Sequence, residues 1–371
     1  MKRAVMLLLL LCGVLFWPTC VSAEEESVKE DFASLYDSLP EESKQRLEEL
    51  GVDAETILSG ETPCPEEWFS VLAGVLKTES PLPLASFGVL IGIVLLCAAT
   101  DGFRSSLGQP ALSEVYQAVC TVGAGAAMML PLSNCMARVA ETAESVTVFM
   151  GSFMPVYVAA LVSGGQIGSA LSCQTLMLAA AEGVAGVITG VIMPLMAVAL
   201  ALGLTGSVGK GLRIGAIGNW LTKSGAWILA TVSSLFVGSL SLRQILAGTT
   251  DTVTARAMRL SLSSFVPVVG GALSEALTTL QGSFLLMRSG VGVFGMVAVI
   301  AIVLPPLCAC VVWSVGLSLC GTMAETLELE RLVGMFRTVA GVVKVLIGAL
   351  AASAMVMIVC TALVLLTGKG A

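Results

Sequence analysis

One apolar run sets the class of this protein: residues 290–318 read GVGVFGMVAVIAIVLPPLCACVVWSVGLS, without a charged side chain. A transmembrane helix needs about 20 predominantly apolar residues, within a range of about 17–25. Seven more runs meet this requirement, at residues 84–100, 115–132, 146–163, 174–204, 226–246, 260–287 and 339–367. We therefore predict an all-α polytopic membrane protein with about eight transmembrane helices. Several of the long runs contain Pro or Gly, which allows kinked or split helices, so a count of seven to nine transmembrane helices stays open.

The composition supports a membrane protein and argues against several functions. Hydrophobic residues make up 56% of the 371 residues and charged residues only 12%, against about 25% charged in a soluble domain. The chain has no histidine, which excludes Ser-His-Asp triads and His-ligated zinc. Its net charge is −7 and it has no basic run, so nucleic acid is not an expected partner. We predict no enzyme activity, no cofactor and no metal site.

The N-terminus resembles a secretory signal peptide at residues 1–23. Lys2 and Arg3 precede an apolar core, and Val21-Ser-Ala23 fits a cleavage site before Glu24. An uncleaved membrane anchor is the alternative.

The exported segment that follows, residues 24–80, is strongly acidic, with 16 acidic and four basic residues. Its apolar spacing predicts helices over Ser38–Leu58 and Trp68–Leu76. A loosely ordered acidic spacer is the alternative. The signal peptide places this segment outside the membrane, and the transmembrane domain occupies residues 81–371.

Two parts of the transmembrane domain are similar in sequence, which predicts an internal repeat. Residues 152–161 align with residues 264–273 at an offset of 112, which matches Pro155 with Pro267 and, further on, Pro194 with Pro306. Repeat A covers about 115–204, repeat B about 226–318, and a final span follows at about 339–367. Three spans per unit would invert the second copy, as in many transporters. A hairpin within 174–204 would make the repeat parallel instead, and the sequence leaves this open.

The strongest functional candidates are ionisable or helix-breaking residues inside apolar spans, where charge is costly. Glu182 and Glu275 are the carboxylates, and the alternative for both is a buried structural carboxylate. The full set of candidates for a polar pathway or helix break is Glu182, Glu275, Pro155, Pro194, Pro267, Gly270, Gly271 and Pro306. The 11 cysteines contain no CxxC pair, so we interpret most of them as small packing residues.

The transmembrane domain resembles the stage III sporulation protein AE family. The resemblance lies in Gly151-Ser-Phe-Met-Pro-Val-Tyr157, Ser264-Phe-Val-Pro-Val-Val-Gly-Gly-Ala-Leu-Ser-Glu-Ala276, Gly292-Val-Phe-Gly295 and Leu304-Pro-Pro306. It covers roughly residues 81–370 and is most specific in the second stretch. The layout of signal peptide, acidic exported region and polytopic remainder is also similar.

The resemblance implies a polytopic component of the complex that joins mother cell and forespore during sporulation. It implies the mother-cell-derived outer forespore membrane, with residues 24–80 facing the intermembrane space. Implied partners are other stage III sporulation membrane proteins, ring-forming subunits and the lipid bilayer. A separate ATPase subunit and a homo-oligomer are also compatible, and no catalytic residues are implied. Within this role the chain is either a channel or permease-like transport component or a scaffold that only anchors partner rings.

Overall fold

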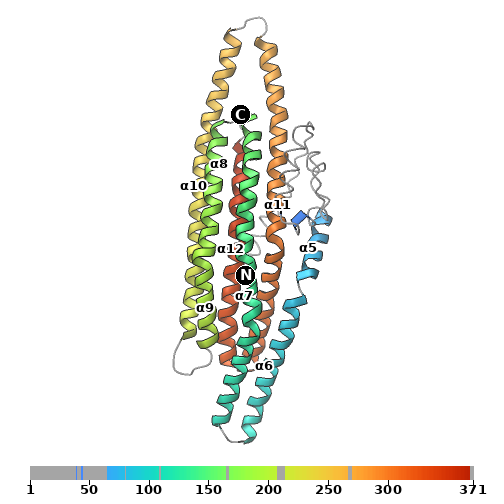
Figure 1. Ribbon diagram of the computed structural model, residues 1–371, viewed down its shortest axis with the longest axis vertical. Helices are drawn as coiled ribbons and strands as arrows, with labels where there is room; N and C mark the ends of the chain where they lie inside the picture. Colours follow the sequence, from blue (N-terminus) through green and yellow to red (C-terminus); the bar gives the residue numbers. More distant parts are fainter. Residues whose placement is uncertain are drawn as a thin grey trace.

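The computed structural model describes Leu39, Ser43, Lys44 and residues 65–79, 81–107, 110–163, 167–206, 214–265 and 270–367. The described part is an elongated bundle of helices that run roughly along one axis (Figure 1). The predicted all-α class is confirmed. The predicted signal peptide lies outside the described residues, as does nearly all of the predicted helix Ser38–Leu58.

Prolines start α5, α6 and α7, at the position where a missing N–H costs no hydrogen bond. In chain order the elements are α5 (Pro65–Glu79), α6 (Pro81–Leu107), α7 (Pro110–Ser163), α8 (Ile167–Val187), the π-helical turn η1 (Ile188–Ile192), α9 (Met193–Gly206), α10 (Ile214–Phe265), α11 (Gly270–Thr326) and α12 (Glu330–Thr367).

The core of the bundle lies around α11 and α12. In the apolar stretches of these two helices 72% and 61% of the residues are buried, against 28–33% in the other apolar stretches. α12 contacts α7, α8, α9, α10 and α11. The last two helices therefore form the centre against which the earlier helices pack.

Five helical segments among the described residues are long and apolar enough to cross a membrane. They are Pro83–Thr100, Val115–Ala159, Gln174–Gly206, Val291–Thr326 and Glu330–Val356. The predicted count of eight is not confirmed.

The predicted separation of 115–132 from 146–163 is wrong, because both lie in the single helix α7. Residues 133–145 between them contain no Gly or Pro, and seven of these 13 residues are Ala, Glu, Met or Arg, which favour helix. The 54 residues of α7 extend over about 81 Å, far more than the roughly 30 Å of a hydrocarbon core.

Residues 174–204 follow one continuous course and do not form a hairpin, so the hairpin alternative is wrong. The backbone passes from α8 through η1 into α9, and the N–H of Met193 donates to the carbonyl of Ile188. Pro194 comes directly after this wide turn. Because proline has no N–H and its ring displaces the carbonyl four residues back, a π turn relieves the conflict without ending the helix.

The internal repeat stays a prediction. α7 with α8 and α9, and α10 with α11, form two long antiparallel pairs (Figure 1). The matched prolines lie in different surroundings, however: Pro155 is inside α7, whereas Pro267 is outside the described residues. Pro194 follows a π turn, whereas Pro306 lies within the unbroken helix α11.

Glycines allow α9, α10 and α12 to approach closely. A Cβ added at Gly203 of α9 would lie 2.7 Å from Cγ2 of Thr338 on α12, and one at Gly218 of α10 would lie 3.0 Å from the same atom. A Cβ at Gly341 of α12 would lie 3.3 Å from Oγ1 of Thr222 on α10. Small residues at these crossings are typical of membrane helix packing, as the abundant glycine suggests.

Candidate functional site

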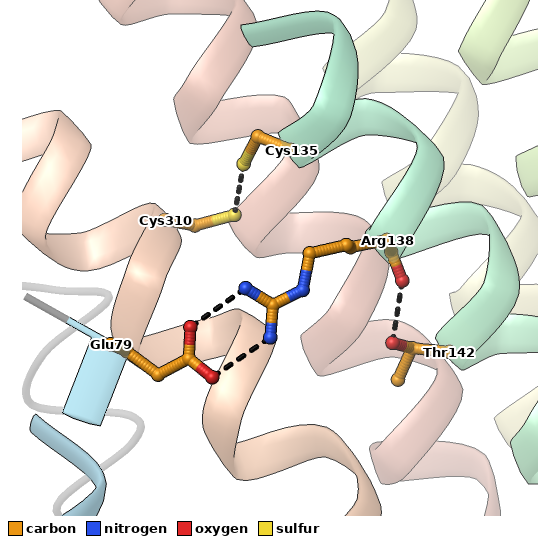
Figure 2. A network of polar contacts seen from close by, with 5 residues as sticks. All are labelled: Glu79, Cys135, Arg138, Thr142 and Cys310. Atoms are coloured by element: carbon orange, nitrogen blue, oxygen red, sulfur yellow. Dashed lines mark hydrogen bonds and ion pairs between the residues drawn. The ribbon is translucent and has the colours of Figure 1, made fainter. Parts of the chain in front are cut away.

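A two-point ion pair joins α5 to α7 (Figure 2). Arg138 of α7 donates from Nη1 to Oε2 of Glu79 at 2.7 Å and from Nη2 to Oε1 at 2.8 Å. The Glu79 side chain is 12% exposed and that of Arg138 is 44% exposed. The carboxylate is thus the shielded partner, and the guanidinium reaches it from a more open position. This bidentate geometry is the strong form of a carboxylate–arginine contact.

The helical spacing of α5 explains why Glu79 points toward the bundle. Val71 and Val75 are buried, and Glu79 follows at the same spacing of four residues. Residues four apart lie on one face of a helix, so the apolar face of α5 ends in this carboxylate. α5 packs against α11 and α6. The ion pair therefore fixes the end of a helix that is already docked by its valines.

Two buried thiols lie one turn away from the ion pair. Cys135 of α7 precedes Arg138 by three residues, and its Sγ lies 3.2 Å from Sγ of Cys310 on α11. The hydroxyl of Thr142 donates to the carbonyl of Arg138 at 2.6 Å on the following turn (Figure 2). On one face of α7, Cys135 thus contacts α11 through its thiol and Arg138 contacts α5 through the ion pair.

A cavity of about 320 Å³ opens beside the ion pair. Its walls come from the end of α5, the start of α6, the middle of α7 and the middle of α11. The lining residues are Glu79, Pro83, Ser86, Leu130, Pro131, Asn134, Cys135, Arg138, Pro306, Ala309 and Trp313.

The cavity wall is mainly apolar and is held by an aromatic contact. The rings of Phe87 and Trp313 meet edge to face at 4.9 Å. The charges of Glu79 and Arg138 neutralise each other, and the lining contains no paired nucleophile and base. This arrangement suits a hydrophobic side chain or a helix junction better than a catalytic reaction.

The residues predicted for a polar pathway are dispersed over the structure. Pro306 is buried and lines the cavity. Glu182 is exposed on α8 and does not line this cavity, and Pro155 and Pro194 are also exposed.

Three of the remaining predicted residues lie at the beginning of α11. Gly270 and Gly271 are its first two residues, and Glu275 lies within its first two turns. The side chain of Glu275 and all of Pro267 lie outside what the structure describes. A polar pathway through Glu182 and Glu275 stays a prediction.

Sequence reasoning missed both partners of the ion pair. Glu79 is one of many acidic residues in its segment, and Arg138 lies between two predicted spans, so neither stood out. The sequence feature that indicates this site is an arginine with apolar runs on both sides, because such an arginine needs an acidic partner. Only the folded chain, which brings together residues 59 positions apart, identifies that partner.

Comparison with known proteins gives a family match over most of the chain. The family model described as stage III sporulation protein AE matches residues 54–368. A similar protein is "Stage III sporulation protein AE" of Bacillus subtilis (strain 168), 25% identical over 292 residues, which cover 76% of this chain and 71% of that protein. No solved structure matches the chain.

Proposed function

Because the chain belongs to the stage III sporulation protein AE family, we propose that it is the polytopic membrane component of the channel complex that links mother cell and forespore. Family membership implies a role in stage III of sporulation. The observation that supports a membrane component is the set of five long apolar helices among the described residues. The proposed location is the mother-cell-derived outer forespore membrane.

The proposed partners are the other stage III membrane proteins and ring-forming subunits in the intermembrane space. A separate ATPase subunit would supply any energy, and the chain itself would carry out no catalysis. Residues 24–80 would face the partners. The Glu79–Arg138 ion pair supports this arrangement, since it gives the end of the exported segment a fixed place on the membrane domain.

Deleting the gene in its spore-forming host tests the proposal. We expect engulfment to be completed, late forespore gene expression to be lost and heat-resistant spores to fall by several orders of magnitude, with rescue by the wild-type gene. A fluorescent fusion should surround the engulfed forespore. Normal spore yield in the deletion strain would exclude the proposed role.

A scaffold without transport is the second candidate, and two observations favour it. The ion pair links α5 to α7, and Glu182 is exposed rather than enclosed in the cavity beside Arg138. A scaffold needs the docked segment, whereas a transport component needs the intramembrane carboxylates.

Two variants separate the candidates. Glu182→Gln combined with Glu275→Gln should block sporulation with the complex still assembled if the chain conducts a solute, and should leave sporulation unchanged if it is a scaffold. Deleting residues 24–80 after the signal peptide should abolish partner co-purification in the scaffold case. Retained co-purification in that deletion would count against the scaffold.

A further inference from the structure

A groove between α10 and α12 concentrates positive charge. Its volume is about 490 Å³, and its lining comprises Asn219, Thr222, Lys223, Ala226, Arg337, Gly341, Lys344 and Val345. Three of these side chains are cationic and none is acidic. The volume is within the range of about 300–1,000 Å³ for small-molecule sites.

Helical spacing places the three cations on one groove. Residues 219, 222, 223 and 226 repeat at intervals of three and four on α10, and residues 337, 341, 344 and 345 do so on α12, so each set forms one face. The two faces meet where Gly341 lies against Thr222, because glycine lets the helices approach. Lys223 and Lys344 therefore lie next to this contact between the two helices.

The cations are available to an added ligand. The side chains of Lys223, Arg337 and Lys344 are all exposed, and none forms an ion pair with a described residue. Polar groups are also present: Thr222 donates to the carbonyl of Asn219 at 2.9 Å, and Thr338 approaches Oδ1 of Asn219 at 3.4 Å. Three like charges without a counter-charge repel one another, and an anion between them removes this cost.

The flanks of the groove indicate where such an anion comes from. Trp220 and Trp227 of α10 are 65% and 69% exposed, next to the lining residues Asn219 and Ala226. Exposed tryptophans are enriched where a helix meets the headgroup level of a bilayer. The uncharged part of α12 after Lys344, which continues to Thr367, is by itself long enough for one crossing, so Lys344 is compatible with this level. Basic pockets between membrane helices bind phosphate-bearing lipid headgroups.

We propose that this groove binds a phosphate-bearing anion through Lys223, Arg337 and Lys344, with the headgroup of an anionic phospholipid as its source. Arginine contributes a planar fork for phosphate oxygens, and the two lysines contribute point charges. Free phosphate has the same chemistry but would not use the tryptophan flank. This site is separate from the Glu79–Arg138 ion pair and does not depend on the proposed function.

The test uses the purified full-length protein in nanodiscs of phosphatidylcholine with increasing phosphatidylglycerol. Bound lipid is counted by native mass spectrometry. Removing one lysine or arginine near an anionic headgroup weakens binding about five-fold, so each single Gln variant should show this loss of affinity. The triple variant Lys223→Gln/Arg337→Gln/Lys344→Gln should lose roughly 100-fold. Lys77→Gln, which removes an exposed lysine of α5 outside the groove, should bind like wild type.

Two further measurements keep the proposal open to refutation. Lys223→Arg/Lys344→Arg keeps the charge and should retain binding, which separates charge loss from misfolding. Titration with inorganic phosphate in neutral detergent distinguishes the source of the anion. Free phosphate is supported if phosphate binding is saturable and needs the three cations while phosphatidylglycerol is not preferred. Equal binding of both probes by wild type and the triple Gln variant would overturn the site.

Discussion

At the scale of single residues, the Glu79 carboxylate and the Arg138 guanidinium decide how α5 joins the bundle. Helix α5 is short, with 15 residues, and isolated helices of this length are marginal in water. Its buried valines supply packing, but packing alone leaves its rotation and its end free. The bidentate ion pair adds direction, because both guanidinium nitrogens must face both carboxylate oxygens.

Removing either partner of this pair should loosen α5. A partly shielded bidentate pair contributes about 1 kcal/mol, the upper part of the range for accessible ion pairs. A double-mutant cycle of Glu79→Gln and Arg138→Gln, measured as free energy of unfolding in a detergent titration, should give that coupling. Glu141→Gln, an exposed acidic residue one turn further along α7, is the control and should change little. A coupling energy below about 0.3 kcal/mol would mean that the pair does not stabilise α5.

The thiol contact makes a second prediction at this scale. Molecular iodine, which oxidises two thiols to a disulfide with release of iodide and protons, should link Cys135 to Cys310, because their sulfurs are 3.2 Å apart. Peptide mass spectrometry would detect the link and the loss of two hydrogens. Cys310→Ser should abolish it and Cys308→Ser should not, since residues two apart on a helix point about 200° apart. A link from Cys135 to Cys308 instead would show a different register of α7 on α11.

At the scale of elements, a glycine determines how closely α6 approaches α11. The ring of Phe87 occupies the space where a Cβ of Gly316 would lie, and the same ring contacts Trp313. The two aromatic side chains thus pack over a helix surface that is flat only because residue 316 has no side chain.

Gly316→Ala should therefore destabilise the protein by about 1–3 kcal/mol, the usual cost of overpacking. The measurement is the free energy of unfolding in detergent. Gly92→Ala in α6, where an added Cβ has no neighbour within 4 Å, is the matched control and should be neutral or slightly stabilising. Combining Gly316→Ala with Phe87→Leu should recover part of the loss. Equal effects of the two glycine changes would contradict this packing.

The elements also show which features the sequence could reveal. The amphipathic run Trp68–Leu76 lies within α5, because its valines recur at helical spacing. The predicted irregularity in 174–204 corresponds to η1, because Pro194 has a local steric effect. The Glu79–Arg138 and Cys135–Cys310 contacts could not be predicted, since they depend on which helices become neighbours. Local periodicity contains no information on that choice.

At the scale of the whole molecule, α7 decides how many times the chain crosses the membrane. Hydropathy divides it into two apolar stretches, and exposed apolar side chains such as Val122 and Val148 lie on both. Between them is a polar stretch with Arg138, Glu141 and Glu144. The low average hydropathy of such a stretch predicts a loop between two spans, but its residues favour helix and the helix continues through it. The polar composition of this stretch predicts a loop, whereas its helical propensity predicts a continuous helix, and the structure has the continuous helix.

A distance measurement across α7 tests this directly. Spin labels at positions 122 and 148 are 26 residues apart, so an unbroken helix separates their backbones by about 39 Å. Two antiparallel spans joined by a loop at 133–145 would instead bring these positions to roughly 20 Å or less, because packed helices lie about 8–10 Å apart. Pulsed electron paramagnetic resonance on the full-length protein in nanodiscs distinguishes the two arrangements.

Labels at positions 227 and 242 provide the control for that measurement. Both positions lie in the predicted span 226–246 and in α10, so the expected separation is about 22 Å whichever description of α7 holds. With this control at its expected value, a short 122–148 distance would restore two separate crossings and three spans in the first repeat unit. A long distance leaves α7 as one helix, so that each predicted unit would contain two long antiparallel arms. An even number of crossings does not invert the second copy, and the argument for an inverted-repeat transporter then loses its topological basis.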